Sequence, residues 1–282
     1  MFKKIELNPP FMIEDKYKNI KLISCDIDGT LMNTNRMLSE KFVEIVNELK
    51  ELGVQFTFAS GRLPYKIMPL ASQINSDLPF VACNGGCIYQ NEKFLFKKMF
   101  SIRILKEVIN LAEILDDTIL YSFDGIEYCL RETEESALKR QKRGSYYPVR
   151  SIKNEEWDKL KILKLNILSN KSISLLKNQL DAIKDKVDIT YYGDFGAEIV
   201  PKGVNKLTGI KQIIGHMNVS LDEVIAIGDN ENDLELLKNV GIGVAVQNAT
   251  QEIKECSNLV TENCGEEGVV EFLEILRTFL KG

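Results

Sequence analysis

Two aspartates one residue apart form the strongest chemical signal in the chain. Asp26 and Asp28 lie in the stretch Ile23–Leu31, where a short apolar run suited to a buried strand ends at an Asp-Gly dipeptide. Residues i and i+2 of a strand share a face, so both carboxylates can enter one small volume. Two close carboxylates are unfavourable unless a cation lies between them or one keeps its proton. The pair therefore predicts a chemical site, although Asp-Gly also occurs in plain turns.

A calcium loop of the EF-hand type is the first alternative for this stretch. Such a loop needs a bidentate Glu at its twelfth position. Counted from Asp26 that position is Met37, and counted from Asp28 it is Ser39. The sequence therefore argues against an EF-hand.

Two further segments carry groups suited to holding phosphate. Ser60, Gly61 and Arg62 follow the strand-like run Val54–Ala59 and precede a helix. A hydroxyl with backbone N–H groups at a helix start can cradle a phosphate, although such a tripeptide is also a common turn. Lys206 is expected near the N-terminal end of another helix, where it is either part of this site or a solvated surface lysine.

A fourth segment, Gly228–Leu234, is dense in oxygen ligands. It contains Asp229, Asn232 and Asp233, and it follows the buried strand expected at 224–228. Carboxylates at a strand end suit Mg²⁺, a hard cation that prefers oxygen ligands. A plain helix-capping loop is the alternative, because Asp and Asn are favoured caps.

Alternating strands and helices are expected to position these groups. Between 21 and 83 the pattern is β-α-β-α-β, with Ser39 as an N-cap and Phe42, Ile45, Val46 and Leu49 on one helix face. Strands at 224–228 and 241–246 continue the pattern, followed by helices near 249–256 and 267–280. Right-handed crossovers would place all these strands in one parallel, doubly wound sheet. Ligands bind at the carboxyl ends of strands in such sheets.

The middle of the chain follows a different pattern. Hairpins are expected at 120–129 and 188–200, with a strand at 162–168 and helices near 102–115 and 172–184. This mixed α+β pattern predicts a domain inserted into the parallel one. The expected organisation is a core formed by 1–85 and 200–282, with an N-terminal extension at 1–18, and an inserted domain at 86–199.

Composition excludes several classes of protein. The chain has 282 residues, of which 44% are hydrophobic and 27% charged, and a formal net charge of −5, which gives no general attraction to nucleic acid or anionic membranes. No apolar run reaches the roughly 18 residues of a membrane helix, and the N-terminus lacks the apolar region of a secretory signal. The six cysteines show no zinc-site spacing and are expected to be reduced thiols, which indicates a cytoplasmic protein. The sequence does not indicate the oligomeric state.

The order of the four motifs resembles that of a known enzyme family. The DxDGT of 26–30, the SGR of 60–62, the lysine after an insertion and the GDxxND of 228–233 together resemble the haloacid dehalogenase superfamily. The similarity is greatest to its Cof-type phosphatases, which carry a large α/β cap between the second and third motifs. It covers roughly 20–282 and implies a Rossmann-like α/β core with an inserted α+β cap that selects the substrate.

The resemblance also implies a role for each motif residue. Asp26 would be the nucleophile that forms an aspartyl-phosphate, and Asp28 would protonate the leaving alcohol and then deprotonate water. Mg²⁺ would be held by the Asp26 carboxylate, the Asp28 backbone carbonyl and Asp229. The phosphoryl oxygens would be bound by Ser60, Gly61, Lys206 and Asn232. The residues that would hold these groups in position without contacting the reacting atoms are Thr30, Arg62 and Asp233.

The expected function is therefore Mg²⁺-dependent hydrolysis of a small phosphate monoester, a sugar phosphate or a phosphorylated cofactor. A phosphomutase that returns the phosphoryl group to its substrate uses the same core motifs and is one alternative. A non-catalytic module that binds a phosphorylated ligand is the other, although a pure binder does not need Asp28. The motifs do not identify the metabolite.

Overall fold

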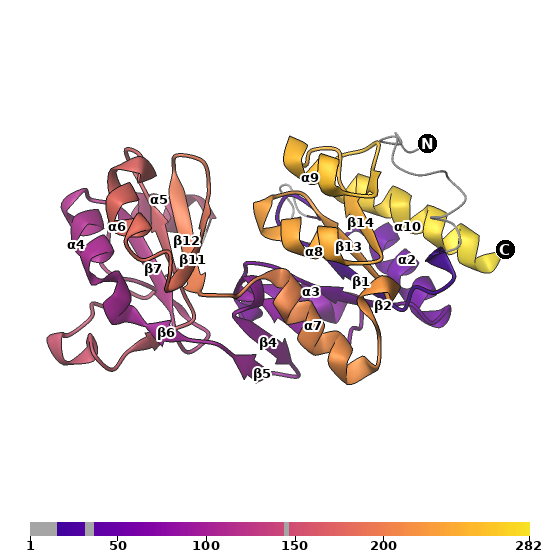
Figure 1. The fold of residues 1–282 in the computed structure, drawn as a ribbon, viewed down its shortest axis with the longest axis horizontal. Helices are drawn as coiled ribbons and strands as arrows, with labels where there is room; N and C mark the ends of the chain where they lie inside the picture. Colours follow the sequence, from indigo (N-terminus) through magenta and orange to yellow (C-terminus); the bar gives the residue numbers. More distant parts are fainter. Residues whose placement is uncertain (1–15, 32–36, 144–146) are drawn as a thin grey trace. The chain divides into compact units, whose positions relative to one another are not determined.

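The computed structural model describes residues 16–31, 37–143 and 147–282. These form two compact units (Figure 1): one comprises the described residues up to Leu95 together with Asn205–Gly282, and the other comprises Phe96–Val204. Most of the extension expected at 1–18 lies outside the described residues. Within its last part, Tyr17 is buried, with its ring 6.4 Å from that of Phe272 and 5.4 Å from that of Phe279.

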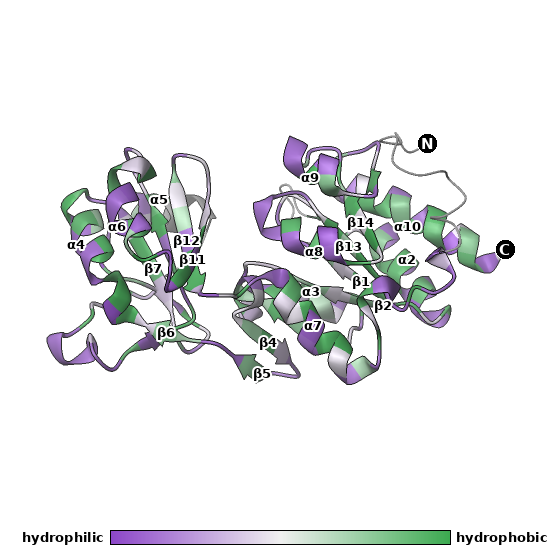
Figure 2. Cartoon of the chain, viewed as in Figure 1, coloured by the Kyte–Doolittle hydropathy of each residue, from purple (hydrophilic) through white to green (hydrophobic). Residues whose placement is uncertain are grey.

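The first unit is built on a five-stranded parallel sheet. Across the sheet the order is β15 (Leu259–Val260), β14 (Ile242–Ala245), β13 (Val224–Gly228), β1 (Leu22–Cys25) and β2 (Gln55–Phe58). The central strands are fully buried and, as Figure 2 shows for β13 and β14, hydrophobic along their length. A parallel sheet covered on both faces requires such strands. Cys25 lies beside Ile227 and Phe58 in the register, so the chain leaves β1, β13 and β2 at one edge of the sheet.

Helices flank this sheet, which confirms the predicted Rossmann-like α/β core. They are α2 (Glu40–Glu51), α3 (Pro64–Gln73), α7 (Lys206–Met217), α8 (Leu234–Asn239), α9 (Gln251–Cys256) and α10 (Gly265–Lys281). Ser39 caps α2 as expected, because its side chain accepts a hydrogen bond from the N–H of Phe42, and the four predicted apolar residues of this helix are buried. Helix α2 packs on α10, while α8 packs on β13 and β14.

One expectation about the sheet is wrong. The strand expected at 80–83 does not join the five-stranded sheet as a full member. It forms β3 (Phe80–Ala82), which pairs with β4 (Cys87–Gln90) and then β5 (Lys93–Lys97) in a separate three-stranded sheet. A single parallel bridge, Ala59 to Val81, connects β3 to the end of β2. Because β4 pairs antiparallel with β3, the first unit extends to Leu95, past the boundary that the sequence placed at 86.

The second unit is an antiparallel sheet with α4 (Lys106–Ile114) and α6 (Lys177–Asp181) contributing to the core on one face. Its main sheet has the order β11 (Val187–Tyr191), β12 (Gly196–Pro201), β10 (Lys164–Leu168), β7 (Thr118–Ser122) and β8 (Glu127–Cys129). The short strands β6 (Phe100–Ser101) and β9 (Lys161–Ile162) pair separately, and the α-helices are α4, α5 (Glu134–Arg143) and α6. Both predicted hairpins are present, as β7–β8 and β11–β12. Among the described residues, no helix has the length and apolar character needed to cross a membrane.

Candidate active site

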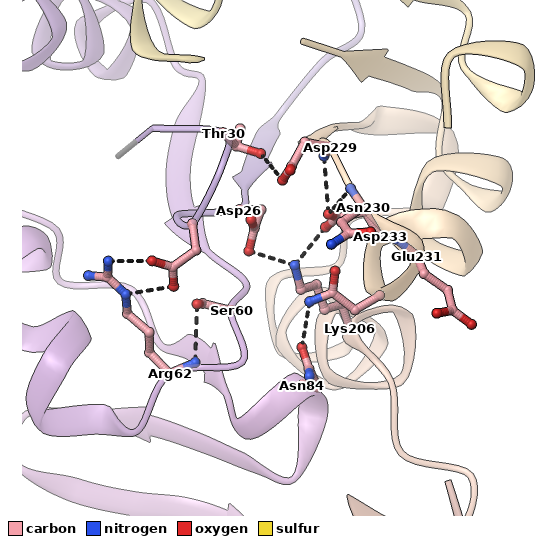
Figure 3. Close-up of polar contacts among 12 residues, drawn as sticks. Asp26, Thr30, Ser60, Arg62, Asn84, Lys206, Asp229, Asn230, Glu231 and Asp233 are labelled. Carbon is pink, nitrogen blue, oxygen red and sulfur yellow. Dashed lines mark hydrogen bonds and ion pairs between the residues drawn. The ribbon is translucent and has the colours of Figure 1, made fainter. Parts of the chain in front are cut away.

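A buried lysine joins two of the predicted aspartates at the carboxyl edge of the parallel sheet. Lys206, the first residue of α7, donates hydrogen bonds from Nζ to Oδ1 of Asp26 at 2.6 Å and to Oδ1 of Asp233 at 2.7 Å (Figure 3). The Lys206 side chain is 0% exposed, so the surface alternative for this residue is wrong. Asn205 fixes the start of α7, because its side chain accepts a hydrogen bond from the N–H of Thr208. The capped helix start therefore presents the ammonium group to both carboxylates.

Asp229 completes a group of three carboxylates. Its Oδ1 accepts a hydrogen bond of 2.9 Å from the hydroxyl of Thr30, which is itself buried (Figure 3). Gly29, with a φ of +85°, lies directly over this carboxylate: a Cβ there would stand 2.2 Å from Oδ2 of Asp229. Behind it, Oδ2 of Asp233 accepts hydrogen bonds from the backbone N–H groups of Asp229 and Asn230. The loop after β13 is thus held by its own aspartate.

Burial and mutual repulsion perturb these acids in the absence of a metal ion. Burial raises the pKa of Asp26, and the ammonium of Lys206 opposes this rise. Burial and the neighbouring charge of Asp233 raise the pKa of Asp229 to about 6. Burial alone would lower the pKa of Lys206, but the carboxylates of Asp233 and Asp26 outweigh it and raise that pKa. The single positive charge of Lys206 therefore does not balance the negative charge of the three carboxylates.

The donor set fits a hard divalent cation. Asp26, Asp229 and Asp233 each offer a carboxylate oxygen, and these three atoms lie within 4.8 Å of one another. Oxygen ligands of this charge and spacing suit Mg²⁺. Asp233 already serves Lys206 and two backbone N–H groups, so Asp26 and Asp229 are the better ligands of the three.

Asp28 does not share the small volume of Asp26. Arg62 holds it by two hydrogen bonds, from Nε to Oδ2 at 2.8 Å and from Nη2 to Oδ1 at 2.7 Å. The Asp28 side chain is 64% exposed, whereas Asp26 is buried. The expectation that both carboxylates crowd together is therefore wrong for this structure. The guanidinium of Arg62 stabilises the Asp28 carboxylate by two hydrogen bonds, whereas a neighbouring carboxylate would repel it.

The second motif meets the fourth through a residue that sequence reasoning did not assign. Asn84, buried after β3, accepts a hydrogen bond of 3.0 Å on its Oδ1 from Nδ2 of Asn232 (Figure 3). The backbone N–H of Asn84 donates to the carbonyl of Ser60. A Cβ on Gly61 would stand only 3.2 Å from the Asn84 amide. The hydroxyl of buried Ser60 accepts from the N–H of Arg62. The sequence signal at this position is the Asn84-Gly85 dipeptide at a strand end, which is typical of a turn and does not by itself predict a contact with Asn232.

An acidic cluster and a buried lysine at the carboxyl edge of a parallel sheet are typical of a phosphoryl-transfer enzyme. Comparisons with known proteins agree. The chain is 26% identical to a 5-amino-6-(5-phospho-D-ribitylamino)uracil phosphatase of Escherichia coli, over 91% of this chain and 96% of that protein. It is also 26% identical to a phosphoglycolate phosphatase of Methanothermobacter thermautotrophicus, over 89% of this chain and 96% of that protein.

Solved structures share the fold. A protein from Thermotoga maritima superposes with a TM-score of 0.76 at 27% identity, covering 91% of this chain and 97% of the other. A HAD/COF-like hydrolase from Plasmodium vivax gives 0.80 at 24% identity, covering 95% and 99%. The model of the haloacid dehalogenase-like hydrolases matches residues 23–273. The chain belongs to this family, and it is a phosphatase of its Cof type.

Proposed function

We propose that this protein is a Mg²⁺-dependent phosphatase that hydrolyses a small phosphorylated metabolite through an aspartyl-phosphate on Asp26. The observation that carries the proposal is the placement of Asp26: it is buried, it is bonded to Lys206, and it lies beside Asp229. A carboxylate in this setting has a fixed orientation and can attack phosphorus only if the surrounding negative charge is balanced. Mg²⁺, held by Asp26, the backbone carbonyl of Asp28 and Asp229, would supply that balance and stabilise charge in the transition state.

The chain's own residues would carry the remaining steps. An oxygen of Asp26 forms a bond to phosphorus as the bond from phosphorus to the leaving oxygen breaks. Asp28 donates a proton to that oxygen, so the product leaves as an alcohol. Asp28 then takes a proton from a water molecule whose oxygen attacks phosphorus, and the bond to Asp26 breaks to release phosphate.

This sequence of steps requires a rearrangement of Asp28. Two hydrogen bonds from a guanidinium stabilise the ionised carboxylate. Asp28 must therefore part from Arg62 before it can hold the proton for the leaving group. In the proposal, Ser60, Gly61, Lys206 and Asn232 hold the phosphoryl oxygens, while Thr30 and Asp233 keep Asp229 and Lys206 in position. The unit formed by Phe96–Val204 selects the leaving group.

The test is hydrolysis of p-nitrophenyl phosphate by the full chain with and without Mg²⁺. Asp26→Asn removes the nucleophilic charge and is expected to abolish turnover. Asp181→Asn changes an exposed aspartate of α6 and serves as the matched control. In a single turnover in ¹⁸O-water, the ¹⁸O is expected in the released phosphate and not in Asp26, because water attacks phosphorus; ¹⁸O found in the Asp26 carboxylate by proteolysis and mass spectrometry would contradict attack at phosphorus. Equal turnover by wild type and Asp26→Asn would refute the assignment of the nucleophile.

A further inference from the structure

A loop after β14 contacts both loops that carry the proposed metal ligands. This β14 loop, residues 246–250, follows directly after the last residue of β14. The N–H of Val246 donates to the carbonyl of Gly228 at 3.3 Å. The N–H of Thr250 donates to the carbonyl of Asp229 at 3.0 Å. The β14 loop is therefore fixed to the backbone of the loop after β13.

The side chain of Asn248 connects the β14 loop to two further segments. Its Nδ2 donates a hydrogen bond of 2.7 Å to the carbonyl of Gly29, in the loop after β1. Its Oδ1 accepts a hydrogen bond of 2.8 Å from the N–H of Gly265, the first residue of α10. A carbonyl can only accept and a backbone N–H can only donate, so these two partners fix the orientation of the amide.

Helix α10 gives this amide a rigid support. The N–H of Gly265 is one of the first N–H groups of the helix, which have no acceptor within the helix itself. The side chain of the N-cap residue Cys264 makes no capping bond, and the oxygen of Asn248 serves Gly265 in its place. Phe272 and Leu273 of α10 are buried, and the helix packs on α2. One end of the Asn248 amide is therefore anchored on the core of the unit, while the other end holds the loop after β1.

The backbone of Gly29 benefits from such an external contact. Its φ is +85°, and glycine restricts its own dihedral angles less than any other residue. The peptide group before Gly29 carries the Asp28 carbonyl, which is a proposed ligand of Mg²⁺. The peptide group after it carries the carbonyl bonded to Asn248 and the N–H of Thr30, whose hydroxyl donates to Oδ1 of Asp229. The bond from Asn248 thus restricts the dihedral angles that orient both peptide groups.

We infer that Asn248 is a positioning residue for the metal site. It acts through Gly29 and Thr30. The carbonyl of Asp28 and the carboxylate of Asp229 are thereby kept in one arrangement that suits a divalent cation. This inference rests on the proposed Mg²⁺-dependent function and adds to it a residue from outside the four motifs. Groups that orient the ligands of a metal ion are worth about 10–100-fold in metal affinity or activity.

The variant Asn248→Asp separates an effect of position from an effect of charge. It keeps the oxygen that accepts from Gly265, but it replaces the donor with an oxygen that repels the carbonyl of Gly29. The added negative charge would by itself strengthen the binding of a cation. The loss of positioning weakens that binding, so the two effects differ in sign. Asn248 is exposed, so the change leaves the core intact.

The main readout is Mg²⁺ binding to the metal-free full chain, measured by titration calorimetry. Asn248→Asp is expected to bind Mg²⁺ about 10-fold more weakly than wild type. The Mg²⁺ concentration for half-maximal hydrolysis of p-nitrophenyl phosphate is expected to rise by about the same factor, with kcat largely restored at saturating Mg²⁺. Asn239→Asp is the matched control, because Asn239 is exposed and its Nδ2 also donates to a backbone carbonyl, that of Glu235 at 2.8 Å. This control is expected to bind Mg²⁺ as wild type does.

A second variant, Asn248→Ala, tests whether the residue only anchors α10. It removes both hydrogen bonds, so a lower melting temperature is expected together with a loss of about 10-fold in Mg²⁺ affinity. A lower melting temperature with unchanged Mg²⁺ binding would overturn the inference, because it would leave only the contact with Gly265. Mg²⁺ binding by Asn248→Asp that equals or exceeds that of wild type would overturn it as well. Absence of Mg²⁺ binding and of turnover in the wild-type protein would instead contradict the proposed function.

Discussion

The contact between Gly29 and Asp229 allows a quantitative test of the site. At Gly29 an added Cβ would lie 2.2 Å from Oδ2 of Asp229, whereas real Cβ atoms essentially never approach a heavy atom closer than 3.0 Å. Gly29→Ala must therefore displace the carboxylate by about 1 Å. A displacement of this size at a reacting centre can cost about 100-fold in rate. The backbone adds strain, because a φ of +85° costs an L-residue about 1–2 kcal/mol.

Gly53 is the matched control for this change. Its φ is +87°, but a Cβ there would meet nothing within 4 Å. Gly53→Ala therefore carries the same backbone strain without the displacement of a carboxylate. Urea unfolding is expected to show a loss of about 1–2 kcal/mol for Gly53→Ala, with kcat/KM for p-nitrophenyl phosphate unchanged.

Gly29→Ala is expected to lose at least that stability and about 100-fold in kcat/KM. The apparent affinity for Mg²⁺, read from the metal dependence of the rate, is expected to fall as well. Activity of Gly29→Ala within twofold of wild type would refute the reasoning, because it would show that the position of Asp229 does not depend on the missing side chain at residue 29.

Three further predictions concern the same site. Lys206→Met leaves two buried carboxylates, Asp26 and Asp233, without their cation, so urea unfolding is expected to show a free energy of unfolding lower by about 3–5 kcal/mol. The loss is expected to be smaller at low pH, where the carboxylates are protonated, and a loss under about 1 kcal/mol would contradict the burial of these ion pairs. In the metal-free protein the folded pKa of Asp229, about 6, lies above the ordinary value of 3.8, so its contribution to stability is present below pH 3.8 and is lost as pH rises through 6. Because Mg²⁺ must displace that proton, calorimetry is expected to show weaker Mg²⁺ binding at pH 5 than at pH 7.5, and equal binding at the two pH values would contradict the raised pKa. Asn84→Gly allows the left-handed backbone at this position, where φ is +51°, but removes the amide that accepts a hydrogen bond from Asn232. The KM for a phosphate ester is therefore expected to rise about 10-fold with little change in melting temperature, and an unchanged KM would contradict a role for this amide.

The sequence predicts where the functional groups gather because parallel strands end at one edge of a sheet. This geometric rule is enough to bring Asp26 and Asp229 together from positions about 200 residues apart. It does not predict side-chain partners. Lys206 could be solvated or buried on sequence grounds, and only the packing of α7 against the sheet edge decides for burial. Asp28 pairs with Arg62 and does not lie beside Asp26. This pairing depends on the position of the Arg62 side chain after β2, which the periodicity of the sequence does not predict.

The boundary of the inserted unit was misplaced for a related reason. The run after the Asn84-Gly85 turn begins with the apolar residues 87–89, a short segment that fits a strand of either unit. Whether such a strand joins the unit before it or the unit after it depends on its pairing partner. Here β4 pairs with β3, so the hairpin remains with the first unit up to Leu95. β15, a strand of two residues, is too short for any periodicity to indicate.

The charges of the site connect the close glycine contact to the need for a metal ion. Asp26, Asp229 and Asp233 place three carboxylates in one small volume, and Lys206 neutralises one charge at most. The contact between Gly29 and Asp229 is not required for a stable turn after β1. It increases the burial of the Asp229 carboxyl group, whose pKa is already raised. The arrangement is favourable when a divalent cation binds, since the same closeness then becomes a short distance between ligand and metal. The need to bind a divalent cation therefore explains both the glycine at residue 29 and the excess of negative charge around it.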